Sequence, residues 1–326
     1  MNKISFPGLG IGEFNLNKTA FTLFGRDVAW YGIIITVGII LAVLYVMNRA
    51  KKYEGMKEDD ILDLAIYIIP ISILGARLYY VLTSLDQYDS IGEMFAIWNG
   101  GLAIYGAVIA GALTSLVWCK IKKVKVLKMY DMLVPAVMIG QILGRWGNFF
   151  NVEAFGGPTD GLFRMCSPEV VSDFVSKGLV NDAQLVALNT GALGAHPTFF
   201  YESMWNLVGF LLINAYYKRK KYHGEIFFMY ISWYGFGRAI IEGLRTDSLY
   251  VGPFRISQVI GLVTFAVGAF FLVWYYFKRC RNAQPILEKE GTLVLKNKKT
   301  EDKNEDKNED KEDKKEKGDK DNGKDN

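Results

Sequence analysis

The chain has 326 residues, of which 51% are hydrophobic and 22% are charged, and its formal net charge is +4. A single soluble domain does not usually combine so apolar a composition with this much charge, so the charge must be concentrated in part of the chain. Residues 296–326 contain 11 Lys and 12 Asp or Glu and no apolar side chain. The remainder is therefore strongly hydrophobic, which excludes an ordinary soluble protein and indicates a polytopic membrane protein with a solvated tail.

Seven apolar stretches are each long enough to cross about 30 Å of hydrocarbon as a helix. The fold class that we predict is therefore all-α, a polytopic membrane protein with about seven transmembrane helices. The stretches cover roughly 28–48, 59–82, 97–119, 130–150, 197–217, 225–243 and 256–277.

Lys and Arg gather after the first, third, fifth and seventh stretches, within 49–57, 120–128, 218–221 and 278–281. Cytoplasmic loops of membrane proteins carry this excess of positive charge. The other connections hold few basic residues. We therefore expect a multi-pass protein of the cytoplasmic membrane whose N-terminus lies outside and whose C-terminus lies in the cytoplasm.

This topology divides the chain into three parts. Residues 1–27 form an extracytoplasmic N-terminal segment, and 28–282 form a seven-helix transmembrane domain in which 151–196 is a small extracytoplasmic cap with one short amphipathic helix. The low-complexity residues 283–326 are expected to be a disordered cytoplasmic tail. Three scattered cysteines suit neither a disulfide framework nor a zinc site, and we expect no metal or cofactor.

Ionisable side chains within or at the mouth of a membrane span mark candidate sites, because they are costly there unless they are paired or hydrated. Arg238 and Glu242 are four residues apart and share a helix face, and Arg245 follows one turn later, so we expect a helical stripe Arg–Glu–Arg in the outer leaflet. Several arginines at one depth suit an anionic lipid headgroup, since guanidinium groups bind phosphate bidentately. For Arg77 or Glu242 taken alone, an ion pair that holds helices together is the alternative explanation. The residues predicted near the outer face are Arg145, Asn148, Asn151, Glu153, His196, Glu202, Arg238, Glu242 and Arg245.

Residues 144–156, GRWGNFFNVEAFG, resemble the signature of the prolipoprotein diacylglyceryl transferase family. The resemblance covers about residues 28–277. Its other pieces, in chain order, are Trp30-Tyr31-Gly32, Gly75-Ala76-Arg77 with Tyr80, Trp98-Asn99-Gly100-Gly101-Leu102, His196-Pro197-Thr198 with Tyr201 and Glu202, Gly237-Arg238 with Glu242 and Arg245, and Ser257-Gln258.

The resemblance implies a bacterial membrane enzyme that performs the first step of lipoprotein maturation, with 28–282 as its catalytic domain. Such an enzyme transfers the diacylglyceryl group of phosphatidylglycerol to the lipobox cysteine thiol in the signal peptide of a prolipoprotein, and it releases glycerol phosphate. Its partners are these two substrates and the lipid bilayer, with no nucleic acid. A lipid flippase or transporter that uses the same charges is the alternative, although we find no repeat between the two halves of the chain.

The resemblance and the charges together select the candidate residues. The catalytic candidates are Arg238, Tyr105, Glu153 and His196, and the substrate-binding candidates are Arg145, Asn148, Asn151, Tyr31, Arg77, Glu202, Glu242 and Arg245.

One candidate departs from the family. Many members carry His where this chain has Tyr105, and a phenol with a pKa near 10 is a poorer base at neutral pH than an imidazole. We therefore favour thiol activation by the nearby arginines, with Tyr105 as a hydrogen-bonding residue instead of the base. His196 could also be the base, but a His-Pro pair before a helix is equally typical of a cap and hinge.

Overall fold

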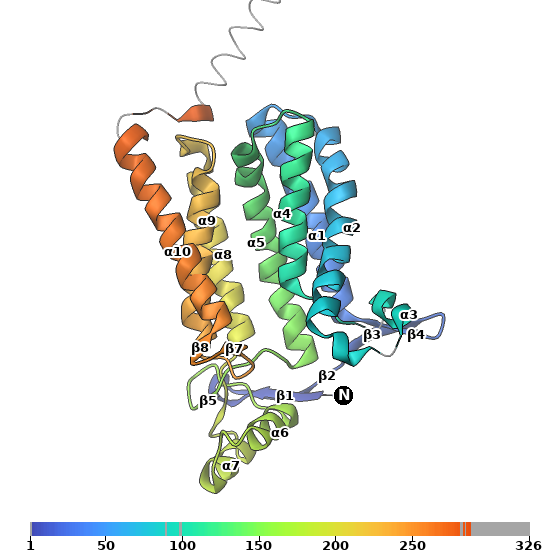
Figure 1. The fold of residues 1–326 in the computed structure, drawn as a ribbon. Coiled ribbons are helices and arrows are strands. Elements are labelled where there is room, and N and C mark those ends of the chain that lie inside the picture. The colour runs from blue at the N-terminus through green and yellow to red at the C-terminus, as the bar shows by residue number, and fades with distance from the viewer. Residues whose placement is uncertain (1, 89, 98–99, 281–282, 284, 288–326) are drawn as a thin grey trace, which may run out of the picture.

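The computed structural model describes residues 2–88, 90–97, 100–280, 283 and 285–287. Seven long helices stand side by side, and smaller elements cover one end of the bundle (Figure 1). They lie within or close to the seven predicted stretches, although α4 begins later than predicted. Within the described residues, five helical segments, which begin at Trp30, Glu58, Ile104, Val126 and Ile256, are long and apolar enough to cross a membrane. The helices are α1 (Trp30–Arg49), α2 (Glu58–Thr83), α4 (Ile104–Ile121), α5 (Val126–Asn151), α8 (Thr198–Tyr216), α9 (Glu225–Glu242) and α10 (Ile256–Tyr275).

The bundle has two groups of helices, α1, α2, α4 and α5 in one and α8, α9 and α10 in the other (Figure 1). Helix α5 joins them, because it packs against both α8 and α9. Buried apolar residues such as Met132 and Trp118 fill the first group, while Met138 and Ile213 pack where α5 meets α8. The outward faces stay apolar, as Leu74 is 64% exposed, and such surfaces suit contact with lipid chains.

Helix α4 begins at Ile104 and not near residue 97, as the apolar stretch predicted. Gly100 and Gly101 have φ angles of 88° and 74°, a left-handed conformation that ends any helix there and that glycine adopts without strain. Before them lies the short helix α3 (Ile91–Phe95). Trp98 and Asn99, which belong to one of the family-like pieces, lie outside the described residues.

The N-terminal segment forms two hairpins, β1 (Asn2–Phe6) with β2 (Ile11–Leu16) and β3 (Thr19–Leu23) with β4 (Arg26–Ala29). The first joins the cap through two hydrogen bonds of 3.0 Å between the backbones of Ser5 and Cys166. Ile4 and Phe174 are completely buried in the shared core. The tertiary contacts that hold residues 2–16 to the cap were not predicted.

The cap contains the predicted amphipathic helix, α6 (Pro168–Ser176), which confirms that expectation. It also contains α7 (Asp182–Asn189) and the paired strands β5 (Pro158–Thr159) and β6 (Gly194–Ala195). The remaining elements are β7 (Tyr250–Val251), β8 (Phe254–Arg255), the 3₁₀ turns η1 (Pro7–Leu9), η3 (Leu85–Gln87) and η5 (Tyr217–Arg219), and the π-helical turns η2 (Ala50–Glu54) and η6 (Tyr276–Cys280). Most of the predicted tail, 283–326, lies outside the described residues.

A buried group of charges closes the end of the bundle opposite the cap. Lys220 contacts Glu54 at 2.5 Å and Asp131 at 3.4 Å, and all three side chains are almost inaccessible to solvent. Tyr217 donates a further hydrogen bond to Glu54 at 2.6 Å. Asp131 also accepts from the backbone N–H of Phe227 at 3.0 Å, in the first turn of α9. This group, which we call the buried lysine cluster, ties both helix groups together.

Candidate active site

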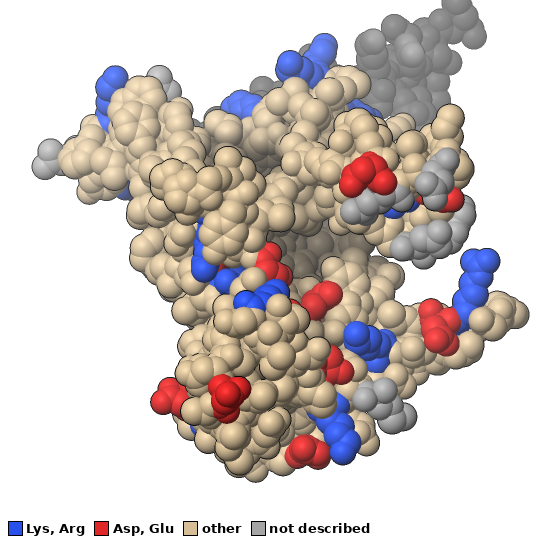
Figure 2. Space-filling view, turned by 60° about the horizontal axis from the view of Figure 1, so that its bottom comes forward, with Lys and Arg blue, Asp and Glu red and all other residues tan. Residues whose placement is uncertain are grey.

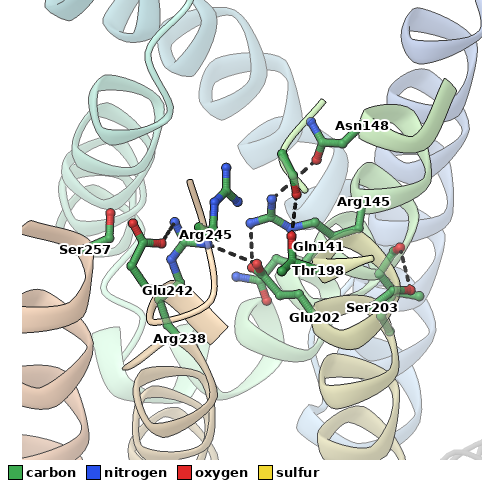
Figure 3. Close-up of polar contacts among 12 residues, drawn as sticks. Gln141, Arg145, Asn148, Thr198, Glu202, Ser203, Arg238, Glu242, Arg245 and Ser257 are labelled. Atoms are coloured by element: carbon green, nitrogen blue, oxygen red, sulfur yellow. Dashed lines mark hydrogen bonds and ion pairs between the residues drawn. The ribbon is translucent and has the colours of Figure 1, made fainter. Parts of the chain in front are cut away.

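The predicted charges meet at the cap end of the bundle, where α5, α8 and α9 converge. Arg145 contacts one carboxylate oxygen of Glu202 at 2.5 Å, and Arg238 contacts the other at 3.0 Å. Arg238 also pairs with Glu242 at 2.7 Å, one helical turn further along α9. Figure 3 shows both guanidinium groups directed at the carboxylate of Glu202. Glu202 and Glu242 are only 3% and 2% exposed, so both carboxylates depend on these arginines for compensation.

The signature segment extends this network towards solvent. Arg145 donates to Asn148 at 3.4 Å, and the amides of Asn148 and Asn151 donate to Glu153 at 2.9 and 3.2 Å. Helix α5 ends at Asn151, and the chain then turns back through Val152, whose φ of 52° brings Glu153 beside the last helical turn. An Arg–Asn–Glu network thus runs from the exposed Glu153 to the buried Glu242.

Glycine allows the cap to approach the network closely. The backbone N–H of Gly156 donates to the carbonyl of His196 at 2.8 Å, and that of Gly157 donates to the carbonyl of Leu244 at 2.8 Å. A Cβ added to Gly156 would lie 2.7 Å from the Leu244 carbonyl oxygen, so a larger residue would push the cap away. Figure 2 shows this end of the molecule brought forward, with a hollow beside acidic and basic side chains.

Two aromatic candidates contact neighbouring helices. The hydroxyl of Tyr105 lies 3.1 Å from Ser257 Oγ and thereby joins α4 to α10. The ring of Tyr31 packs on α5 at Gly147, where an added Cβ would lie 2.5 Å from the ring. Gly147 lies between Arg145 and Asn148 in sequence, so Tyr31 flanks the network.

His196 lies where the cap meets α8. Its Nδ1 is 3.4 Å from the hydroxyl of Tyr201. Burial lowers the pKa of His196 below its usual value of 6.5, so the imidazole is neutral at pH 7. A neutral imidazole can accept a proton, although its contact here is with a tyrosine and not with a residue of the network.

Arg245 differs from its predicted position. Helix α9 ends at Glu242, so Arg245 does not continue a helical stripe with Arg238 and Glu242, and that expectation is wrong. Arg245 instead forms a bidentate pair with Asp247, with contacts of 2.8 and 2.7 Å. Burial raises the pKa of Asp247, but the hydrogen bonds and charge of Arg245 outweigh this effect and lower it overall.

Arg77 lies in a different environment. It is 6% exposed and donates to the backbone carbonyls of Glu93, Met94, Gly100 and Gly101 at distances of 2.6 to 3.0 Å. These bonds compensate its charge and hold the connection between α2 and α4. These contacts are hydrogen bonds to backbone carbonyls and not the ion pair that the sequence left open as the alternative for Arg77.

Sequence reasoning assigned no role to four residues around the site. Asp247 and Ser257 had no predicted role, and the stacked pair Trp205 and Trp233 was not noticed. The pair does have a signal in the sequence, since each tryptophan is followed by a glycine four residues later within an apolar stretch. In the part of the chain that the structure describes, no group of three His, Cys, Asp or Glu side chains is arranged to hold a metal ion.

Comparison with known proteins identifies the family. A model of the family described as prolipoprotein diacylglyceryl transferase matches residues 18–274. The chain belongs to this family. It is 40% identical over 262 residues to the phosphatidylglycerol–prolipoprotein diacylglyceryl transferase of Finegoldia magna, covering 80% of this chain and 96% of that protein. The proteins of the same name from Lysinibacillus sphaericus and Clostridioides difficile are 41% and 39% identical over 81% and 82% of the chain, and 93% and 98% of their own lengths.

Family membership confirms the resemblance seen in the signature segment. The chain is a transferase of lipoprotein biosynthesis, and its helices make it a multi-pass membrane protein. The matched range includes all seven long helices except the last residue of α10, together with the cap and the whole Arg–Asn–Glu network.

Proposed function

We propose that this transferase moves the diacylglyceryl group of phosphatidylglycerol to the lipobox cysteine of a prolipoprotein signal peptide. The C–S bond forms at the glyceryl carbon, while the bond from that carbon to the phosphate oxygen breaks. The electron pair leaves with glycerol phosphate, and the thiol proton is released. The observation that carries the proposal is the Glu202 carboxylate held between Arg145 and Arg238 beside the cap.

Arg145 and Arg238 are the proposed phosphate ligands. Each guanidinium has five N–H donors, and the contacts named above use only two of them on each residue. Their side chains are 19% and 16% exposed, so a headgroup can reach them. Donors fixed in this way also stabilise the negative charge that grows on the leaving phosphate, which lowers the barrier. Glu202 holds both donors in place, and Glu242 does the same for Arg238.

The same arginines favour the thiolate form of the incoming cysteine. A free thiol with a pKa near 8.5 is already a few per cent ionised at neutral pH, and nearby positive charge increases that fraction. Glu202 and Glu242 are committed to arginines, whereas the hydrogen bonds that Glu153 accepts come from amides. Glu153 is therefore the carboxylate that we assign to receive the thiol proton. The contact of Tyr105 with Ser257 supports a role in joining helices over a role as base.

The site faces the outer side of the membrane in this proposal, with the N-terminus outside and the C-terminus in the cytoplasm. The basic residues of the loops at the opposite end support this orientation. Asp86→Cys and Lys218→Cys in a chain without its native cysteines test it, because both positions are exposed. We expect an impermeant thiol reagent to label residue 86 from outside and residue 218 only after the membrane is opened. The reverse pattern would contradict the orientation.

Transfer can be measured directly with the purified protein. Vesicles that contain phosphatidylglycerol with a labelled diacylglyceryl group are incubated with a lipobox peptide, and the peptide is analysed for label. A peptide with Ser in place of Cys and vesicles without phosphatidylglycerol are the controls. We expect label only on the Cys peptide. Movement of lipid between leaflets without labelled peptide would overturn the proposal and favour a flippase.

A further inference from the structure

Two tryptophans connect α8 to α9 beside the Arg–Asn–Glu network. The indole N–H of Trp205 donates to the backbone carbonyl of Trp233 at 3.0 Å, and the indole N–H of Trp233 donates to the carbonyl of Trp205 at 2.9 Å. The two rings stack with centroids 4.3 Å apart and planes inclined by 16°. The helices thus exchange a reciprocal pair of hydrogen bonds, which we call the tryptophan clamp. It also satisfies two N–H groups that would be costly to leave unpaired in a membrane.

Two glycines make room for the clamp. Gly209 follows Trp205 by four residues, and Gly237 follows Trp233 by four. A Cβ added to Gly209 would lie 2.2 Å from Nε1 of Trp233, and one added to Gly237 would lie 2.1 Å from Nε1 of Trp205. In a helix, the carbonyl group of one residue lies next to the residue four positions later. When that later residue is glycine, no side chain covers the carbonyl oxygen, and its second lone pair can accept from the indole N–H. Even a methyl group at either glycine would displace an indole ring.

The clamp determines the register of α8 against α9. A helix rises 1.5 Å per residue, so a shift of one residue would break both hydrogen bonds and force the rings against helix backbone. Glu202 lies three residues before Trp205 on α8, and Arg238 directly follows Gly237 on α9. The 3.0 Å contact between Arg238 and Glu202 therefore depends on the register that the clamp sets.

We propose that Trp205 and Trp233 are positioning residues for the transfer reaction, which hold Glu202 where it binds Arg145 and Arg238 at once. The proposal rests on the proposed function, in which those arginines bind the lipid phosphate. Without the clamp, α8 and α9 can slide while each helix stays intact. The two guanidinium groups then no longer contact the same fixed carboxylate of Glu202, although neither tryptophan touches substrate.

Trp205→Phe and Trp233→Phe test the proposal, singly and together, because phenylalanine keeps an aromatic ring but has no N–H. Misplacement of reacting groups by about 1 Å can cost about 10²-fold, so we expect each single change to lower kcat by about 10- to 100-fold. The KM for the peptide should stay within about twofold. Since either change alone opens the clamp, the kcat of the double variant should be no more than about threefold below that of the less active single variant.

Matched controls separate positioning from general packing. Trp274 on α10 is 41% exposed, and Trp274→Phe should keep kcat within about twofold. Gly237→Ala should resemble the clamp variants. Gly140→Ala on α5 should not lower kcat as the clamp variants do, because a Cβ at Gly140 meets no atom within 4 Å.

Rates are compared per folded molecule, so a smaller amount of folded protein cannot be mistaken for misplacement of Glu202 and its arginines. Clamp variants that keep kcat within twofold of the parent would overturn the proposal, as would single losses that simply multiply in the double variant. If the double variant does not fold, the single variants decide. Absence of transfer by the unaltered protein would instead refute the proposed function, so the two failures can be distinguished.

Discussion

Glu202→Gln is the sharpest test of the network, because Glu202 contacts both Arg145 and Arg238. The substitution keeps the size of the side chain and removes its charge. The amide oxygen of glutamine can accept from one guanidinium, while its NH₂ group faces the other as a second donor. Two arginines would then share a buried site without the carboxylate between them.

The magnitude follows from the burial of Glu202, which is 3% exposed. A hydrogen bond to a charged group contributes about 1.5–3 kcal/mol, and removal of one partner from a buried ion pair costs about 3–5 kcal/mol. We therefore expect the free energy of unfolding to fall by about 3 kcal/mol. If the same interaction supports the transition state, kcat/KM falls by about 10²-fold, since 1.36 kcal/mol corresponds to a factor of ten.

Glu54→Gln in the buried lysine cluster is the matched control. Glu54 is 4% exposed and contacts Lys220 at 2.5 Å, so its charge is as deeply buried and as closely paired as that of Glu202. It lies at the opposite end of the bundle. We expect a similar loss of stability with kcat/KM, measured per folded molecule, within about threefold of the parent.

The assay is peptide transfer in phosphatidylglycerol vesicles, with the thermal unfolding midpoint measured on the same samples. A Glu202→Gln enzyme with kcat/KM within threefold of the parent would refute the reasoning. Equal loss of activity in Glu54→Gln would also refute it, because the effect would then come from weakened packing and not from the site.

Four further expectations concern residues around the network and the tail. Arg145→Lys keeps the charge but loses the forked donors, so we expect at least about 10²-fold lower transfer with normal membrane insertion; near-normal turnover would remove its phosphate role. Tyr105→Phe removes the contact with Ser257, so the activation free energy of transfer should rise by the ~1–3 kcal/mol of one lost buried polar contact. The transfer rate should not recover at high pH. Recovery at high pH would make Tyr105 the base. Burial lowers the pKa of His196 in the folded protein, so below about pH 6.5 the unfolded chain binds a proton more readily and the stability of the fold should decrease. His196→Gln should lose this sensitivity to acid. Unfolding midpoints of both proteins at pH 7.5 and 5.5 measure the difference. Deletion of 296–326 should leave transfer within about twofold, since a segment without apolar side chains cannot bury a core, and an inactive but normally inserted truncation would contradict this.

Hydrophobic length predicted where the seven long helices lie, because a membrane span must be long and apolar along most of its length, and five helical segments among the described residues meet that requirement. It failed at the start of α4, where every residue of 97–103 except Asn99 is also apolar or glycine. The backbone there is set by the left-handed Gly100 and Gly101 and by hydrogen bonds from Arg77, which lies on another helix. A contact of that kind leaves no trace in local hydropathy.

The sequence predicted which residues gather at the site but not which of them form ion pairs with one another. Glu202, Arg145 and Arg238 each lie near the end of an apolar stretch, so the topology alone placed them at one depth. That Glu202 contacts both arginines depends on α8 packing against both α5 and α9, which sequence periodicity does not specify. Arg245 was misplaced for a local reason, because α9 ends at Glu242 and the chain turns towards Gly156.

The buried lysine cluster has a consequence for how the protein is made. Its members come from distant parts of the chain, and Glu54 and Asp131 are synthesised long before Lys220. Because synthesis proceeds from the N-terminus, the early helices enter the membrane while these two carboxylates still lack the cation that later lies between them. A polypeptide that stops before residue 220 therefore lacks the cation that contacts both carboxylates, although it already contains Lys128, which lies 3.7 Å from Glu54 in the finished fold.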